Sequence, residues 1–217
     1  MLLNYNPPRF PYLTIVYQDD DLLIIDKPSG LLTVPGKDPK HADSLIRRAN
    51  VVFPSAKIVH RLDMATSGII CLALTKEAHR NLSMQFQERQ TAKEYIAIVD
   101  GQLTPEQGSV DLPLICDWPN RPKQMVDMEN GKPSLTHYQV LSRSGDATRV
   151  RLTPVTGRSH QLRVHMLSLG HVILGDRLYA HPEAKARAER LQLHAHWLTL
   201  THPTTGEAMT FTAPCPF

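Results

Sequence analysis

The stretch from His60 to Gly68 concentrates side chains that can do chemistry. Five of its nine residues can donate or accept hydrogen bonds, and it comes directly before the most apolar run of the chain, residues 69–74. A carboxylate held on a loop against a buried strand is partly shielded from water and well positioned, which suits a nucleophile or a general base. Asp63 is therefore the candidate catalytic residue. The alternative is structural, with Asp63 or Thr66 only capping a turn.

A second cluster of polar side chains spans residues 156–165 and contains Arg163. On a helix, Leu162, Met166 and Leu169 would form an apolar stripe with Arg163 at its edge. A guanidinium among apolar neighbours is costly unless a carboxylate meets it, and Asp63 is a candidate partner that Arg163 would orient and keep ionised. In the alternative interpretation, Arg163 lies along the surface with its stem on Met166.

Tyr95 is the third candidate, because it shares a strand face with Lys93. An aromatic ring beside a cation is one way to hold a nucleobase. The alternative is that Tyr95 is an ordinary packing residue of the strand.

The motifs of metal and cofactor sites are missing from the sequence. The eleven histidines form no H-E-x-x-H motif and no Cys/His pairing, and His160 and His165 would diverge on a helix. The glycine-rich signatures of nucleotide-binding sites and the G-x-S-x-G motif of serine hydrolases are also missing. We therefore expect no metal and no cofactor.

The elements that position these residues are predicted to be a mixture of strands and helices. The segment 101–132, rich in proline and polar residues, is expected to be an ordered excursion outside the core. Irregular alternation with hairpins favours an α+β fold, with a mixed, mainly antiparallel sheet and flanking helices, over a doubly wound one. The sequence predicts helices at about 43–50 with Asp43 as cap, at 76–88 with Thr75 as cap, and from about 159. It predicts strands at 13–16, 22–25, 69–74, 92–99, 135–141, 147–152, 191–201 and 208–212.

The positive charge of the chain is concentrated in two tracts. Residues 143–190 hold nine Lys/Arg against four acidic residues, and residues 56–93 hold six against three, whereas the whole chain carries only +3. Such tracts could form a basic face that attracts phosphate backbones, with Arg177 and Arg187 among the contacts. Alternatively, these side chains are simply a solvated surface.

The chain length and the cysteines limit the class of protein. Its 217 residues suffice for one globular domain, and three widely spaced cysteines predict no disulfide framework. No apolar stretch approaches the roughly 18 residues that a membrane span needs, and a basic-then-apolar signal peptide is missing. We therefore expect a cytoplasmic protein.

Several of these segments resemble the ordered signature of the RluA-type pseudouridine synthases. The matching motifs are Lys27-Pro-Ser-Gly30, His60–Gly68, Lys93-Glu-Tyr95, Thr156–His165, His171–Tyr179, and Leu193-His-Ala195 with Pro214. One departure is visible: His171-Val172-Ile173 stands where His-Pro-Ile is commoner, so Val172 takes the place of the proline. The length, and the expectation of a single catalytic domain over 1–217 without an N-terminal S4-type extension, resemble the branch of the family described as acting on both 23S rRNA and the anticodon arm of tRNA.

The resemblance implies roles for particular residues. Asp63 would be the catalytic aspartate, Tyr95 the residue packed on the target base, and Arg163 the partner of Asp63. It also implies the pseudouridine synthase fold, with two lobes beside a central cleft, and no cofactor or metal. We expect RNA contacts from Arg61, which would fill the gap left by a flipped-out uridine, and from Arg158, His160 and Arg177.

Two other classes of function remain open from the sequence. The chain could be an RNA-binding or ribosome-assembly factor that keeps the fold without catalysis, or a metal-dependent hydrolase acting on RNA. Neither a membrane nor an obligate protein partner is expected, and the expected partners are 23S rRNA and the tRNA anticodon stem-loop.

Overall fold

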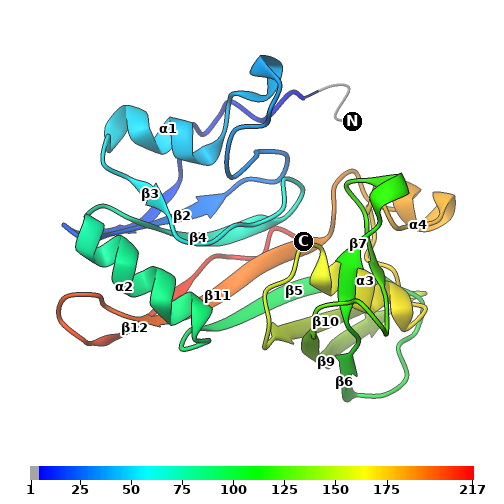
Figure 1. The fold of residues 1–217 in the computed structure, drawn as a ribbon. Coiled ribbons are helices and arrows are strands. Elements are labelled where there is room, and N and C mark those ends of the chain that lie inside the picture. Colours follow the sequence, from blue (N-terminus) through cyan, green and yellow to red (C-terminus); the bar gives the residue numbers. More distant parts are fainter. Residues whose placement is uncertain (1–4) are drawn as a thin grey trace. The chain divides into compact units, whose positions relative to one another are not determined.

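The computed structural model describes residues 5–217, which divide into two compact units (Figure 1). We call residues 5–93 with 195–216 the N-terminal unit, and residues 94–194 with Phe217 the central unit. Two strands, β5 (Ala92–Asp100) and β11 (Leu193–Thr201), each contribute residues to both units.

The N-terminal unit is built around strand β4 (Ser67–Ala73). In the strand order, β4 lies between β2 (Leu22–Lys27) and β11, and it pairs antiparallel with β2. Every residue of β4 is buried, so both faces of the strand are covered, and the predicted central strand is confirmed. The remaining strands are β1 (Ile15–Gln18), β3 (Lys57–Ile58) and β12 (Ala208–Thr212), which pair with β2, β4 and β11.

Helices α1 (Leu45–Val52) and α2 (Lys76–Gln87) lie on opposite sides of β2 and β4 (Figure 1). A short 3-10 helix, η1 (Pro39–His41), precedes α1. Ala78 and Leu82 of α2 enter a core cluster with strand residues such as Leu22, Cys71 and Leu198. The hydroxyl of Thr75 accepts a hydrogen bond from the Ala78 amide at 3.1 Å, so Thr75 caps α2 as predicted.

The predicted cap of α1 is wrong. Ser44, not Asp43, occupies the N-cap position. The Asp43 carboxylate instead accepts hydrogen bonds from Nε and Nη2 of the buried Arg48, at 2.9 and 2.7 Å. Two charge-assisted bonds to a desolvated guanidinium are stronger than one bond to a helix amide, which accounts for the difference.

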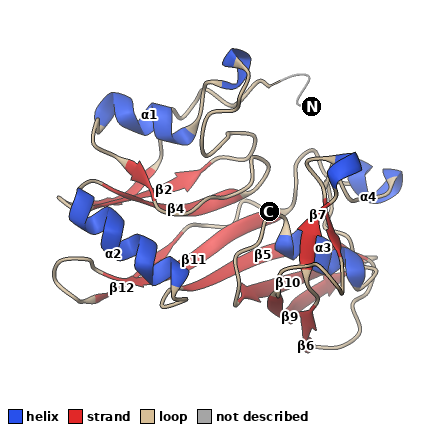
Figure 2. Cartoon of the chain, viewed as in Figure 1, coloured by secondary structure: helices blue, strands red, loops and turns tan. Residues whose placement is uncertain are grey.

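The central unit carries its own antiparallel strands. Residues of β5 pair with β10 (Ala147–Pro154), β10 pairs with β9 (Leu135–Ser144), and β9 pairs with β6 (Gln107–Asp111). Two short helices follow, α3 (Gln161–Ser168) and α4 (Pro182–Ala186). Strands dominate both units, as Figure 2 shows, and the expected α+β class with a mainly antiparallel sheet is confirmed.

The segment 101–132 is more regular than expected. It contains β6, which extends the sheet with Val110 buried, and a separate hairpin of β7 (Leu114–Cys116) and β8 (Gln124–Val126). A 3-10 helix, η2 (Trp118–Asn120), lies between the two hairpin strands. The expectation that this segment lies outside the core is therefore wrong for β6, because five polar-rich residues give too weak an alternating pattern to reveal a strand.

Candidate active site

Asp63 lies in the loop that leads from β3 into β4, and the motif Lys27-Pro-Ser-Gly30 holds this loop. The Gly30 amide donates to the Met64 carbonyl at 2.8 Å, and the Ser29 hydroxyl donates to the Ala65 carbonyl at 2.6 Å. The two residues that follow Asp63 are thus fixed to the turn that comes after β2. Because the loop is bonded to a core strand, the position of Asp63 is well defined.

Lys27 is the buried centre of this attachment. Its side chain is fully inaccessible to solvent, and Nζ donates to the carbonyls of Pro28, Leu31 and Met64 at 2.9, 2.8 and 3.1 Å. An ammonium group has three protons to donate, and three carbonyl oxygens here accept them. Lys27 therefore ties its own turn and the Asp63 loop together.

Thr33 and His60 hold the other side of the loop. The Thr33 hydroxyl donates to the Leu62 carbonyl at 2.7 Å, and His60 Nε2 accepts from the Cys71 amide at 3.0 Å. The His60 ring stacks on Phe86 with 4.3 Å between centroids. Burial, with the nearby charge of Lys93, lowers the pKa of His60 to about 3, so the ring is neutral and its Nε2 carries no proton.

A turn does exist at Asp63. It is closed by the main chain, since the Thr66 amide donates to the Asp63 carbonyl oxygen at 3.1 Å. The alternative in which Asp63 or Thr66 caps this turn through its side chain stays a prediction.

Arg163 is buried, with only 4% of its surface exposed, so the alternative of a surface-lying side chain is wrong. Its Nε and Nη2 donate to Oδ2 and Oδ1 of Asp176, both at 2.7 Å. Asp176 is itself buried and also accepts from the amides of Leu178 and Tyr179. Sequence reasoning did not identify Asp176 as a partner, although it stands in the motif His171–Tyr179.

Tyr179 joins several predicted site residues of the central unit. Its hydroxyl is bonded to His160 Nδ1 at 2.7 Å and accepts from the Gln124 amide at 2.7 Å. The Arg163 guanidinium carbon lies 5.0 Å from the centroid of the Tyr179 ring. Arg163 and His160 are therefore brought together around Tyr179, a residue that was not predicted to have a role.

Tyr95 is a half-buried residue of β5 opposite Leu152 of β10. Lys93, expected to accompany it, has its Nζ 5.7 Å from the centroid of the Phe86 ring, and burial lowers the pKa of this ammonium group. The interpretation of Lys93 and Tyr95 as a joint holder of a nucleobase gains no support from this position of the cation.

Among the predicted RNA contacts, Arg61, Arg158 and Arg177 are exposed, and the His160 side chain is half-buried. Arg158 Nε donates to the Pro133 carbonyl at 3.3 Å, so its guanidinium is anchored at one nitrogen.

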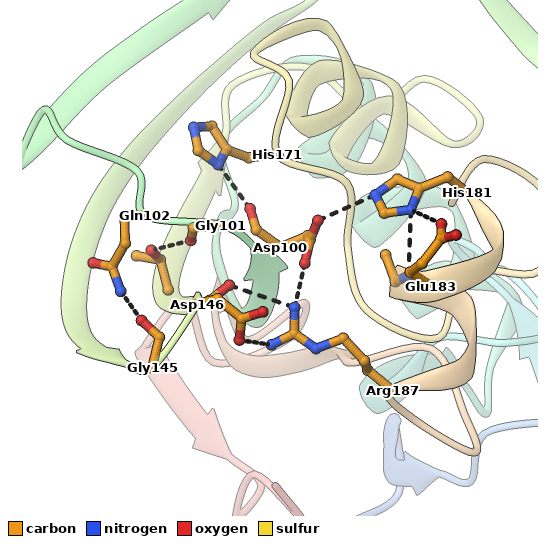
Figure 3. Close-up of polar contacts among 11 residues, drawn as sticks. Asp100, Gly101, Gln102, Gly145, Asp146, His171, His181, Glu183 and Arg187 are labelled. Carbon is orange, nitrogen blue, oxygen red and sulfur yellow. Dashed lines mark hydrogen bonds and ion pairs between the residues drawn. The ribbon is translucent and has the colours of Figure 1, made fainter.

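Arg187 differs from these residues, because it forms ion pairs with Asp100 and Asp146 (Figure 3). Its charge is therefore compensated, and the expectation that it contacts phosphate loses its basis.

The predicted residues are divided between the two units. Asp63 and Arg61 belong to the N-terminal unit, and Tyr95, Arg158, His160, Arg163 and Arg177 belong to the central unit. The ion pair between Asp63 and Arg163 stays a prediction. In residues 5–217, no group of three or more His, Cys, Asp or Glu residues could hold a metal ion, and no helix is long and apolar enough to span a membrane.

The chain is similar to known proteins over almost its whole length. The family model "RNA pseudouridylate synthase" matches residues 21–168. The chain is 60% identical over 215 residues to "Dual-specificity RNA pseudouridine synthase RluA" of Escherichia coli (strain K12), covering 99% of this chain and 98% of that protein. It is 56% identical over 217 residues to the protein of the same name from Haemophilus influenzae, covering 100% and 99%.

Solved structures agree with these matches. "Human RNA Pseudouridylate Synthase Domain Containing 1" aligns with a TM-score of 0.82 at 33% identity, covering 98% of this chain and 87% of that one. "Human RNA Pseudouridylate Synthase Domain Containing 4" aligns with a TM-score of 0.77 at 28% identity, covering 94% and 88%. The chain therefore belongs to the RNA pseudouridylate synthase family, and the predicted activity, isomerisation of uridine to pseudouridine in RNA, is confirmed at the level of the family.

Proposed function

We propose that this chain modifies uridine in two classes of RNA, 23S rRNA and the tRNA anticodon stem-loop, and that Asp63 is its catalytic carboxylate. The breadth of substrate is supported by the relatives that are named dual-specificity synthases and match almost the whole chain. The proposal carries with it a cytoplasmic location, where these RNAs reside.

The assignment of Asp63 depends on one observation, the fixation of its loop. Main-chain atoms of Leu62, Met64 and Ala65 are bonded to the turn after β2, and the loop runs into a strand that is buried at every residue. A carboxylate on such a support can be held ready for reaction, because its backbone does not need to be ordered when RNA binds.

The reaction requires little beyond a positioned carboxylate. The N1–C1′ bond of uridine breaks, the base turns, C5 bonds to C1′, and the proton on C5 leaves while N1 gains one. Asp63 could attack C1′, add to C6, or remove a proton so that a glycal-like intermediate forms. All three routes need Asp63 ionised at the outset.

Three further residues receive roles in this proposal. Arg163 would orient Asp63 through a guanidinium–carboxylate ion pair, in addition to its pair with Asp176. Tyr95 would hold the detached uracil, with its hydroxyl assisting loss of the C5 proton. Arg61, exposed two residues before Asp63, would occupy the gap left by the extruded uridine.

Tritium release tests the proposal directly. Purified, chelator-treated protein is mixed with RNA that carries tritium at C5 of uridine, using an unmodified anticodon stem-loop and a fragment of 23S rRNA in separate assays. We expect release from both RNAs, abolished in Asp63→Asn with RNA affinity within a few fold of wild type. Asp20→Asn, an exposed acid of the same unit, is the matched control and should keep full activity.

Each failure has a distinct meaning. Appreciable turnover by Asp63→Asn would remove Asp63 from the catalytic role. Release from only one RNA would contradict dual specificity. RNA binding without release would support a binding or assembly factor. RNA cleavage by protein that has not been treated with chelator, and that stops on chelation, would support a metal-dependent hydrolase.

A further inference from the structure

Trp118 is unusually exposed for a tryptophan. The chain has two tryptophans, and Trp118, at the tip of the β7–β8 hairpin, has 62% of its surface exposed. Exposure of so large an apolar ring to water is unfavourable, and exposed aromatic rings are concentrated at binding sites. No role assigned so far involves this residue.

The tip that carries Trp118 is well ordered by its own bonds. The guanidinium carbon of Arg121 lies 3.7 Å from the centroid of the Trp118 ring. The amides of Asp117, Asn120 and Lys123 donate to main-chain carbonyls within the tip at 3.0 to 3.1 Å, and the Asn120 side chain donates to both carboxylate oxygens of Asp117. One face of the indole is thus covered by a cation.

The same tip is attached to the site residues of the central unit. The Gln124 amide, at the end of the tip, donates to the Tyr179 hydroxyl at 2.7 Å, and Lys123 Nζ lies 6.0 Å from the Tyr179 ring centroid. Tyr179 in turn contacts His160 and Arg163. The tip that carries Trp118 is therefore attached to Tyr179, which also contacts His160 and Arg163.

We propose that Trp118 is a stacking platform for an unpaired base of the substrate RNA, a base other than the uridine that is isomerised. Every nucleobase has a π-face, so an aromatic ring backed by an arginine binds unpaired bases with little dependence on their identity. Arg121 places positive charge beside the ring for a phosphate, Lys123 adds a second charge on the same tip, and the adjacent acid, Asp117, is hydrogen-bonded to Asn120. The inference rests on the proposed function, because it takes RNA as the substrate.

Such a platform would serve an enzyme with two kinds of substrate. Stacking on Trp118 would require a base that is unpaired and lies at the correct distance from the active site, whatever the identity of that base. Two RNAs that differ in sequence can then share one contact, provided both present an unpaired base at that point. Trp118 would therefore contribute to the capture of RNA and leave the chemical step unaffected.

Single-turnover and steady-state kinetics on the anticodon stem-loop test the platform. For Trp118→Ala we expect KM to rise roughly 5- to 150-fold, as loss of one base stack predicts, with kcat at saturating RNA unchanged. Trp118→Phe should recover most of the affinity. Met128→Ala removes another exposed apolar side chain of the same excursion, 72% exposed, and is expected to leave both constants unchanged.

Fluorescence gives a second readout that does not depend on turnover. In Trp197→Phe protein carrying Asp63→Asn, emission comes from Trp118 alone and should be quenched when the stem-loop binds. An abasic residue placed at each unpaired loop position in turn should abolish the quenching at one position. If Trp197→Phe fails to fold, the difference in quenching between otherwise wild-type protein and Trp118→Phe gives the same information.

The possible results separate this inference from the proposed function. Normal tritium release with an unchanged KM for Trp118→Ala, or with no quenching of Trp118, would overturn the platform and leave the function intact. Absence of any release by wild-type protein would overturn the function, whereas quenching by RNA would then still support the platform. Recovery of activity by Phe but not by Leu at position 118 would show that an aromatic ring, not merely apolar bulk, is needed.

Discussion

At the scale of single residues, polar groups in this protein act mainly by fixing other groups. Lys27, Thr33 and His60 all belong to chemically active residue types, yet their observed bonds are to main-chain atoms of the Asp63 loop and β4. The lowered pKa of His60 is part of this role, because a protonated ring could not accept a bond from the Cys71 amide at Nε2.

The buried pair of Arg163 and Asp176 is expected to show strong energetic coupling. Removing either charge deprives the other, desolvated charge of this partner, which costs about 3–5 kcal/mol. We therefore expect Arg163→Met and Asp176→Leu each to lower the free energy of unfolding by that amount. The double variant should lose clearly less than the sum of the two, as measured by urea unfolding.

The hydrogen bonds that Asp176 accepts from two main-chain amides limit how much stability the double variant can recover. The Leu178 and Tyr179 amides lose their partner in Asp176→Leu and in the double variant alike, so full restoration is not expected. Additive losses would contradict the pair as a coupled unit. An effect near zero for Arg163→Met would contradict the burial of its charge.

At the scale of elements, the start of β4 depends on a residue without a side chain. Gly68 has a φ of +112°, and a Cβ at this position would lie 2.2 Å from the carbonyl oxygen of Ala195 in β11. The close approach and the backbone conformation both require glycine. The residue that ends the His60–Gly68 motif is therefore there for packing between strands.

Gly68→Ala is expected to destabilise the protein strongly. Gly206 offers a matched control, because its φ is +76° and a Cβ there would meet no atom within 4 Å. Gly206→Ala should cost only the backbone penalty, about 1–2 kcal/mol. Gly68→Ala adds the displacement of β11, so its urea midpoint should fall well below that of Gly206→Ala, and equal midpoints would contradict the close contact.

The elements themselves could largely be predicted from the sequence. The central strand, α2 with its Thr75 cap, and most of the later strands follow from apolar runs and local capping rules. The strands β6, β7 and β8 could not be predicted, because each is only three to five residues long, too short to show an alternating pattern, and β6 pairs with β9 further along the chain. The role of Tyr179 could not be predicted either. Its hydrogen bonds to Gln124 and His160 join residues that are far apart in the sequence, so motif spacing does not reveal them.

At the scale of the whole molecule, acid stability is expected to depend on His60. Its pKa in the folded state is about 3, below the ordinary 6.5, so between these values the unfolded chain binds a proton that the folded chain does not. Stability should therefore be complete above about pH 6.5 and fall as the pH drops towards 3, with a limiting slope of about 1.4 kcal/mol per pH unit. In His60→Gln, whose amide oxygen can still accept from Cys71, this contribution should vanish.

Urea unfolding at pH 7.5 and pH 5 measures that difference. The wild type should lose more stability between the two conditions than His60→Gln does. His181 supplies an internal contrast, since bonds to Glu183 and Asp100 raise its pKa and its stabilising effect is lost as the pH rises (Figure 3). Identical pH dependence in His60→Gln and wild type would contradict a neutral His60 in the folded state.

The distribution of charge over the molecule determines how RNA binding responds to salt. Net charge does not identify the contacts, because an arginine paired with acidic residues releases few counterions when RNA binds. Arg177 is exposed, whereas Arg187 is paired with Asp100 and Asp146, so the two provide a comparison within one unit. We expect Arg177→Ala to weaken binding to the anticodon stem-loop and to reduce the slope of log affinity against log salt by about one. Arg187→Ala should leave the slope unchanged, and a reduced slope for Arg187→Ala alone would mean that its ion pairs open to admit phosphate.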